Sequence, residues 1–137
     1  MSRLIVDTSV AVKWFVPEPY AEPARSVLTG DHQLLAPDLL FAEFGNVMWK
    51  RVRSGEMTAE EATAVVSGLL QVPLQARPSR DLALAALEIA NRTQRTVYDG
   101  LYLALAVSEG ASLVTADERA IQCGQGHSPW RARRVGS

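Results

Sequence analysis

The acidic residues whose positions could serve catalysis are Asp7, Glu43, Asp99 and Asp117. Asp7 and Asp117 each follow a short apolar run that is typical of a buried strand, whereas Glu43 and Asp99 lie in or at the start of apolar-patterned helices. Carboxylates are costly to hold near a core unless something offsets their charge. Their grouping would therefore indicate a bound divalent cation.

The expected positions of these carboxylates indicate where such a site would form. In open α/β sheets, ligands bind outside the carboxyl ends of the strands, so Asp7 and Asp117 could face one crevice. Asp99 would add the start of a helix, and Glu43 lies one position off an apolar helical stripe, which would aim it along the core edge. Hard oxygen ligands suit Mg²⁺ or Mn²⁺. Such ions could activate a water for an in-line phosphoryl displacement.

Each carboxylate also has an ordinary structural interpretation. Asp7 could cap the first helix and Asp99 could cap its own helix. Asp117 could be a turn residue. Glu43 could lie on an exposed helix face, as most glutamates do. The occurrence of all four in this order, on these elements, favours a functional site over four separate structural roles.

Small polar residues beside the acids could support them. Ser9 and Thr115 carry hydroxyls that could bind a ligating carboxylate or a metal-bound water. Thr8 and Ser9 are also candidates for the N-cap of the first helix. Asn46 lies about one helical turn after Glu43. We therefore treat Ser9, Asn46 and Thr115 as supporting residues.

The pattern of apolar residues predicts alternating strands and helices. Helices are expected over residues 10–16, 21–28, 37–54, 58–70, 79–91 and 100–109, and strands over residues 3–7, 33–36, 72–76 and 112–115. A short helix is expected after Asp117, and a last edge strand near residues 132–135. Strands separated by helices predict a mostly parallel sheet with helices on both faces.

Composition limits the functional classes. The chain has 137 residues, 47% of them hydrophobic and 21% charged, which predicts one domain over residues 1–137 with a less typical tail over residues 124–137. A net charge of −1 excludes a uniformly basic nucleic-acid binder, although local clusters such as Lys50, Arg51 and Arg53 could hold a polyanion. No apolar run approaches the ~20 residues that span a bilayer. Without a signal-peptide pattern, we expect a cytoplasmic protein.

Four ordered segments resemble a known family. They are residues 5–15 (IVDTSVAVKWF), residues 35–40 (LAPDLL) leading to Glu43, residues 96–106 (TVYDGLYLALA) and residues 113–117 (LVTAD). Together they are similar to PIN-domain toxins of the VapC type, over roughly Arg3 to Ile121. One departure is Gly100, where a small residue such as alanine is more usual, and we expect it to weaken the helix start only slightly.

The resemblance implies a fold, an activity and partners. It implies a three-layer α/β/α sandwich around a central sheet, and an Mg²⁺- or Mn²⁺-dependent endoribonuclease that hydrolyses RNA phosphodiester bonds. Asp7, Asp99 and Asp117 would hold the metal, and Glu43 would complete its shell or orient the attacking water. The protein would be the toxin of a type II toxin–antitoxin pair, a homodimer neutralised by a VapB-type antitoxin that places a basic side chain among the acids.

Two other functional classes stay open at this point. A metal-dependent phosphatase of the haloacid-dehalogenase type also begins with a strand-end aspartate, but it usually has a second aspartate two residues later, where this chain has Ser9. A regulatory or partner-binding α/β domain with an acidic metal pocket is the other. A phospho-accepting receiver of this kind needs a lysine at the end of a later strand, and the segment around Asp117 supplies none.

Overall fold

The computed structural model describes residues 2–116 and 132–134 of the 137-residue chain. The described elements, in chain order, are β1 (Ser2–Val6), α1 (Thr8–Phe15), α2 (Ala21–Thr29), β2 (His32–Pro37), α3 (Leu39–Arg53), α4 (Ala59–Leu69), β3 (Leu74–Arg77), α5 (Ser79–Thr93), α6 (Val97–Glu109), β4 (Ser112–Thr115) and β5 (Ala132–Arg134). The short helix expected after Asp117 lies outside the described residues. The other predicted helices and strands are present, with shifts of a few residues at their ends.

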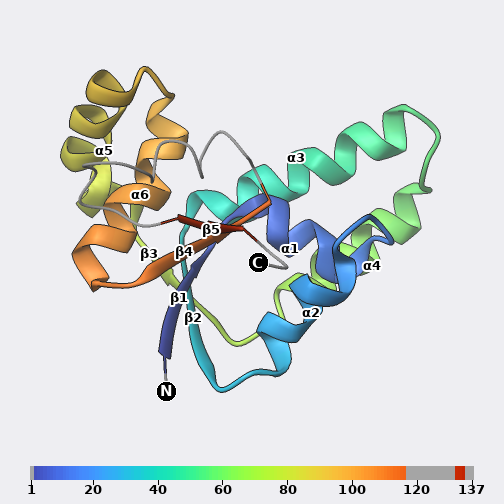
Figure 1. The fold of residues 1–137 in the computed structure, drawn as a ribbon. Coiled ribbons are helices and arrows are strands. Elements are labelled where there is room, and N and C mark those ends of the chain that lie inside the picture. Colours follow the sequence, from blue (N-terminus) through green and yellow to red (C-terminus); the bar gives the residue numbers. More distant parts are fainter. Residues whose placement is uncertain (1, 117–131, 135–137) are drawn as a thin grey trace.

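The strands form one sheet in which β1 is central. Their order is β3-β2-β1-β4-β5, and every pairing is parallel (Figure 1). The expectation of a mostly parallel sheet is therefore confirmed in the described part of the chain, and β5 is the edge strand expected near residues 132–135. Because the strands are parallel, the carboxyl ends of β1 and β4 lie at the same edge of the sheet, with Val6 in register with Val114.

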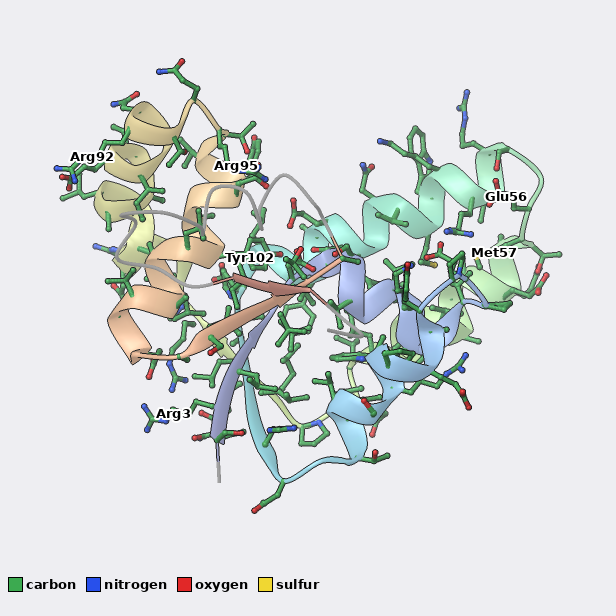
Figure 2. The ribbon with its side chains drawn as sticks, in the orientation of Figure 1. Arg3, Glu56, Met57, Arg92, Arg95 and Tyr102 are labelled. Atoms are coloured by element: carbon green, nitrogen blue, oxygen red, sulfur yellow. The ribbon has the colours of Figure 1, made fainter. Side chains whose placement is uncertain are left out.

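Helices cover both faces of the sheet. Helices α5 and α6 lie on one side, and α1, α2, α3 and α4 lie on the other (Figure 1). Consecutive residues of the central strand, Leu4, Ile5 and Val6, are all buried, as expected for a parallel strand covered on both faces. The three-layer arrangement is thus confirmed. Figure 2 shows Tyr102 of α6 in the interior, whereas Arg92 points outward from α5.

The long helix α3 presents an apolar stripe to the core. Leu40, Phe44 and Met48 are spaced by four residues, and each is at most 1% exposed. Helix α4 starts with a capping box, in which the side chains of Thr58 and Glu61 each accept a hydrogen bond from the other residue's backbone amide. Within the described residues, no helix has the length and apolar character needed to cross a membrane.

Helices α5 and α6 pack closely at Gly100. Gly100 is buried, and a Cβ added to it would overlap the carbonyl oxygen of Ala86 on α5. The expectation that this glycine only slightly weakens the helix was therefore incomplete. Its missing side chain lets the two backbones approach, and this approach sets the position of the first turn of α6, which carries Asp99.

We predict that Gly100→Ala destabilises the protein. Alanine favours a helix by about 1 kcal/mol over glycine, but separating two packed backbones costs roughly 1–3 kcal/mol. Urea unfolding should show a lower midpoint for the variant. Gly45→Ala in α3 is the matched control, because an added Cβ there meets no atom within 4 Å. If both substitutions raised the urea midpoint equally, the α5–α6 contact would accommodate a Cβ at position 100 without loss of stability.

Candidate functional site

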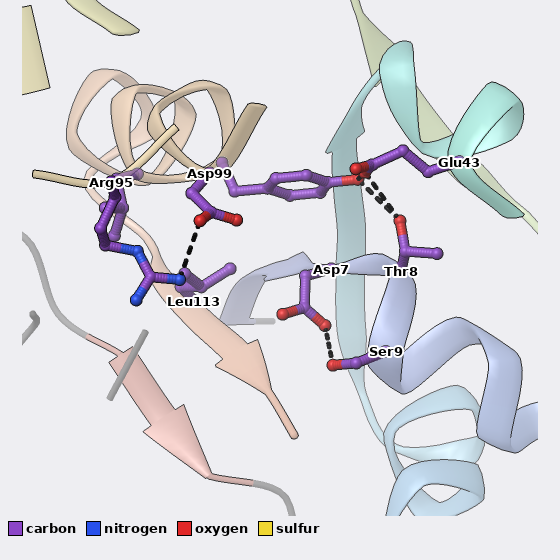
Figure 3. Close-up of a pocket in the computed structure, with 9 residues that line it drawn as sticks. Asp7, Thr8, Ser9, Glu43, Arg95, Asp99 and Leu113 are labelled. Carbon is purple, nitrogen blue, oxygen red and sulfur yellow. Dashed lines mark hydrogen bonds and ion pairs between the residues drawn. The ribbon is translucent and has the colours of Figure 1, made fainter. Parts of the chain in front are cut away.

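Three of the four predicted acids face one pocket at the carboxyl ends of β1 and β4. The pocket lies beside the starts of α1 and α6 and is lined by Asp7, Thr8, Ser9, Glu43, Arg95, Asp99, Tyr102, Leu103 and Leu113 (Figure 3). Asp117 lies outside the described residues. The structure therefore brings together carboxylates separated by up to 92 residues in the chain (99 − 7).

Asp7 joins the end of β1 to the start of α1. It is the N-cap of α1, and its Oδ1 accepts hydrogen bonds from the Val10 amide at 3.2 Å and the Ser9 hydroxyl at 2.5 Å. The Thr115 hydroxyl at the end of β4 donates to Oδ2. The capping interpretation of Asp7 is confirmed, whereas Thr8 and Ser9 do not cap this helix. Both Ser9 and Thr115 instead hold the Asp7 carboxylate.

Glu43 reaches the pocket from α3, and Asp99 and Glu43 lie on either side of Asp7 (Figure 3). It is half-buried, so the interpretation as an exposed helix residue is wrong. Its Oε1 accepts hydrogen bonds from the Thr8 hydroxyl at 3.0 Å and the Tyr102 hydroxyl at 2.6 Å. Asn46 does not line this pocket; it lines a neighbouring groove.

Tyr102 is a site residue that our sequence analysis missed. It lies three residues after Asp99 and therefore on the same face of α6, which was the available signal. Tyr102 is only 6% exposed. Burial, reinforced by the negative charge of Glu43, raises the pKa of the Tyr102 phenol far above its usual value. The phenol consequently stays protonated and serves as a donor to Glu43.

Asp99 lies in the first turn of α6. The N-cap is Thr96, whose hydroxyl accepts a hydrogen bond from the Asp99 amide at 3.1 Å. Asp99 therefore does not cap its own helix, and α6 begins at Val97, three residues earlier than predicted. This placement frees the Asp99 carboxylate from capping. It forms an ion pair with Arg95, with 3.0 Å between Nη2 and Oδ2 (Figure 3).

A basic groove adjoins the acidic pocket. Thr8, Ser9 and Glu43 border both, and the groove continues between α1 and α3 along Lys13, Lys50 and Arg51. Lys13 and Arg51 pair with Glu18, whereas Lys50 is exposed. The two lysines of the chain thus line a surface next to the acids. Of the cluster Lys50, Arg51 and Arg53, which could hold a polyanion, Lys50 and Arg51 line this groove.

The donor set fits a hard divalent cation. Asp7 and Asp99 face each other across the pocket and offer carboxylate oxygens, with no histidine or cysteine among the lining residues (Figure 3). No group of three or more His, Cys, Asp or Glu side chains within the described residues is close enough to hold a metal. A pair of carboxylates still suits Mg²⁺, which typically binds one or two carboxylates together with waters and substrate phosphates.

Comparison with known proteins gives consistent matches. Residues 4–124 match the PIN domain family. The chain is 30% identical to Ribonuclease VapC3 of Pyrobaculum aerophilum, covering 85% of this chain and 91% of that protein. It is 28% identical to Ribonuclease VapC12 of Mycobacterium tuberculosis, covering 91% and 94%. Its fold matches the crystal structure of VapBC2 from Rickettsia felis with a TM-score of 0.70, 14% identity, and coverage of 96% of this chain and 98% of that one.

We predict that Tyr102→Phe changes how stability depends on alkaline pH. The folded-state pKa of Tyr102 lies above the ordinary value of 10.0, so its contribution to stability is full below pH 10 and is lost as the pH rises further. The unfolding free energy of the wild type should fall relative to the variant by about 1.4 kcal/mol per pH unit above pH 10.

Urea unfolding of both proteins between pH 8 and pH 11 measures this difference. The exposed Tyr20 and Tyr98 are present in both proteins, so their effects cancel. At neutral pH the variant should be less stable by about 1–2 kcal/mol, because Glu43 loses a donor. Parallel pH profiles for the two proteins would show that the phenol is not held protonated.

Proposed function

Because the chain belongs to the PIN domain family, we propose that it is a divalent-metal-dependent endoribonuclease and the toxin of a type II toxin–antitoxin pair. The observation that carries this proposal is the pocket in which Asp7, Glu43 and Asp99 converge at the carboxyl ends of parallel strands. The family match covers these three positions and Asp117. The two relatives named as ribonucleases align with at least 85% of the chain.

We assign metal binding to Asp7 and Asp99, together with Asp117. Ribonucleases of this family generally depend on a divalent metal, and carboxylate oxygens favour Mg²⁺ or Mn²⁺ here. When bound, such an ion lowers the pKa of a coordinated water and stabilises charge on a phosphoryl group. Ser9 and Thr115 orient the Asp7 carboxylate through their hydroxyls. These contacts set the direction of the ligating oxygens before substrate arrives.

Glu43 is suited to orient the attacking water. Thr8 and Tyr102 both donate to Oε1, which fixes the carboxylate plane and leaves Oε2 to accept a hydrogen bond from a water. Because Tyr102 stays protonated, Glu43 keeps this donor over the whole physiological pH range. In this scheme Asn46, which borders the neighbouring groove, would contact substrate rather than Glu43.

The phosphatase alternative gains no support from the site. Position 9, where that chemistry would place a second acid, is a serine whose hydroxyl donates to Asp7. An RNA substrate, in contrast, would also bind in the adjoining groove. Lys13, Lys50 and Arg51 would contact phosphates that flank the cleaved bond.

We further propose a VapB-type antitoxin as the partner, a homodimer as the toxin's own assembly, and the cytoplasm as its location. The structural neighbour from Rickettsia felis is a VapBC protein bound to a DNA fragment from its promoter. An acidic pocket open to a basic side chain and a groove between α1 and α3 offer such a partner two adjacent binding surfaces.

The central test is cleavage of RNA. Purified protein incubated with total bacterial RNA and Mg²⁺ or Mn²⁺ should produce discrete new 5′ ends, which sequencing will map. Asp99→Asn removes a charged metal ligand while keeping its size, so we expect cleavage to fall at least about 100-fold while the protein still folds and melts cooperatively.

Asp81→Asn is the matched control. Asp81 also lies in the first turn of a helix, α5, but it is exposed and does not line the pocket. This variant should cleave like the wild type, and EDTA should abolish cleavage by both. Full activity of Asp99→Asn with a normal melting curve would remove Asp99 from the catalytic set.

We also predict that Lys50→Ala weakens RNA binding. Loss of one phosphate contact should lower affinity across sequences and reduce the slope of log affinity against log salt by about one. Binding can be measured in the Asp99→Asn background, where RNA is not cut. Arg80→Ala, an exposed cation on α5 at the opposite face of the sheet, is the control. Equal salt slopes for the two variants would place the RNA elsewhere.

A further inference from the structure

Arg95 is a cation placed inside the acidic pocket. It precedes the N-cap Thr96 in the connection between α5 and α6, and it lines the pocket together with Asp7, Glu43 and Asp99 (Figure 3). Its side chain is 8% exposed, whereas that of Arg92, three residues earlier, is 69% exposed. Arg95 is therefore a pocket residue and not a surface arginine that happens to lie near an acid.

The stability of α6 does not explain this placement. A cation beside a helix N-terminus faces the positive end of the helix dipole. Removing the Arg95 guanidinium from water costs free energy, and a buried ion pair such as the one with Asp99 is weak evidence for a stabilising role. A role in the chemistry of the site accounts better for the burial of this charge.

The chemistry of the pocket requires such a group. A phosphodiester that enters a pocket lined by carboxylates is repelled by each of them. The guanidinium of arginine is planar, always charged, and matches two phosphate oxygens at once. Arg95 currently bonds Asp99, which is also a proposed metal ligand. A cation that takes the Asp99 carboxylate would release the guanidinium at the place where the phosphate arrives.

We propose that Arg95 is a substrate-contacting residue, held on Asp99 in the metal-free protein and transferred to an RNA phosphate when Asp99 binds a divalent cation. The proposal rests on the ribonuclease function proposed above. In the metal-free protein Arg95 would compete with the metal for Asp99, and in the metal-bound protein it would bind an RNA phosphate. Removal of its charge must therefore have opposite effects on metal binding and on RNA use.

The test uses Arg95→Gln with Arg92→Gln as the matched control. Arg92 also forms an ion pair with an acid four residues away, Glu88, but on the exposed surface of α5 (Figure 2). Binding of Mn²⁺ alone, measured by calorimetry and electron paramagnetic resonance, should tighten about tenfold in Arg95→Gln, because a positive charge beside the ion is lost. In Arg92→Gln it should be unchanged.

Steady-state cleavage at saturating Mn²⁺ provides the second readout. Arg95→Gln should raise the KM for RNA about tenfold or more, the cost of one charge-assisted hydrogen bond. Arg95→Lys keeps the charge without the planar fork, so it should keep the metal affinity near that of the wild type and recover KM only in part. Melting curves check that each variant is folded. If Arg95→Gln does not fold, the metal affinity and KM of Arg95→Lys provide the test.

The outcomes separate the two proposals. Unchanged Mn²⁺ affinity in Arg95→Gln would overturn the competition for Asp99. Tighter Mn²⁺ binding with an unchanged KM would overturn the phosphate contact. If the wild type cut no RNA at all, the ribonuclease function would fail, and so would the assignment of Arg95 to substrate, while a tenfold tighter Mn²⁺ affinity would still support its competition with the metal.

Discussion

Repulsion among carboxylates is the constraint that the site must satisfy before it can bind anything. Asp7, Glu43 and Asp99 face one pocket, and each carries its own set of partners. Asp7 accepts from a backbone amide and two hydroxyls, Glu43 from a hydroxyl and a phenol, and Asp99 pairs with Arg95. Because these donors and the Arg95 cation offset the repulsion between the carboxylates, the three acids can lie around one pocket.

These partners also join the layers of the fold. Tyr102 on α6 and Glu43 on α3 lie 59 residues apart and come from helices on opposite faces of the sheet, yet they bond directly beyond the strand ends. Thr8 at the start of α1 contacts both. Side chains of α1 and α6 therefore meet at a carboxylate that α3 carries. Disruption of this cluster would alter the packing of the layers and the geometry of the site together.

The sequence predicted the parts of this arrangement that depend on local patterns. The short apolar run that ends at Asp7 predicted β1, because a buried parallel strand is apolar on both faces. The contacts of Tyr102 and Arg95 were missed, since they depend on how closely α6 approaches α5 and the sheet. Gly100 permits that approach, and the helix propensity of glycine does not predict such a contact between helices. The position of Asp117 and the single-domain organisation of the whole chain stay predictions.

The difference between neutral and charged partners suggests how the site is controlled. Hydroxyls and a phenol orient Asp7 and Glu43 without cancelling their charge, whereas Arg95 offsets the charge of Asp99. The pocket therefore keeps a net negative charge that attracts a further cation. A divalent metal would supply that charge, and so would a basic side chain of the proposed antitoxin. Because both cations would seek the same residual charge, inhibition by such a partner should depend on competition with the metal as much as on blocking the groove.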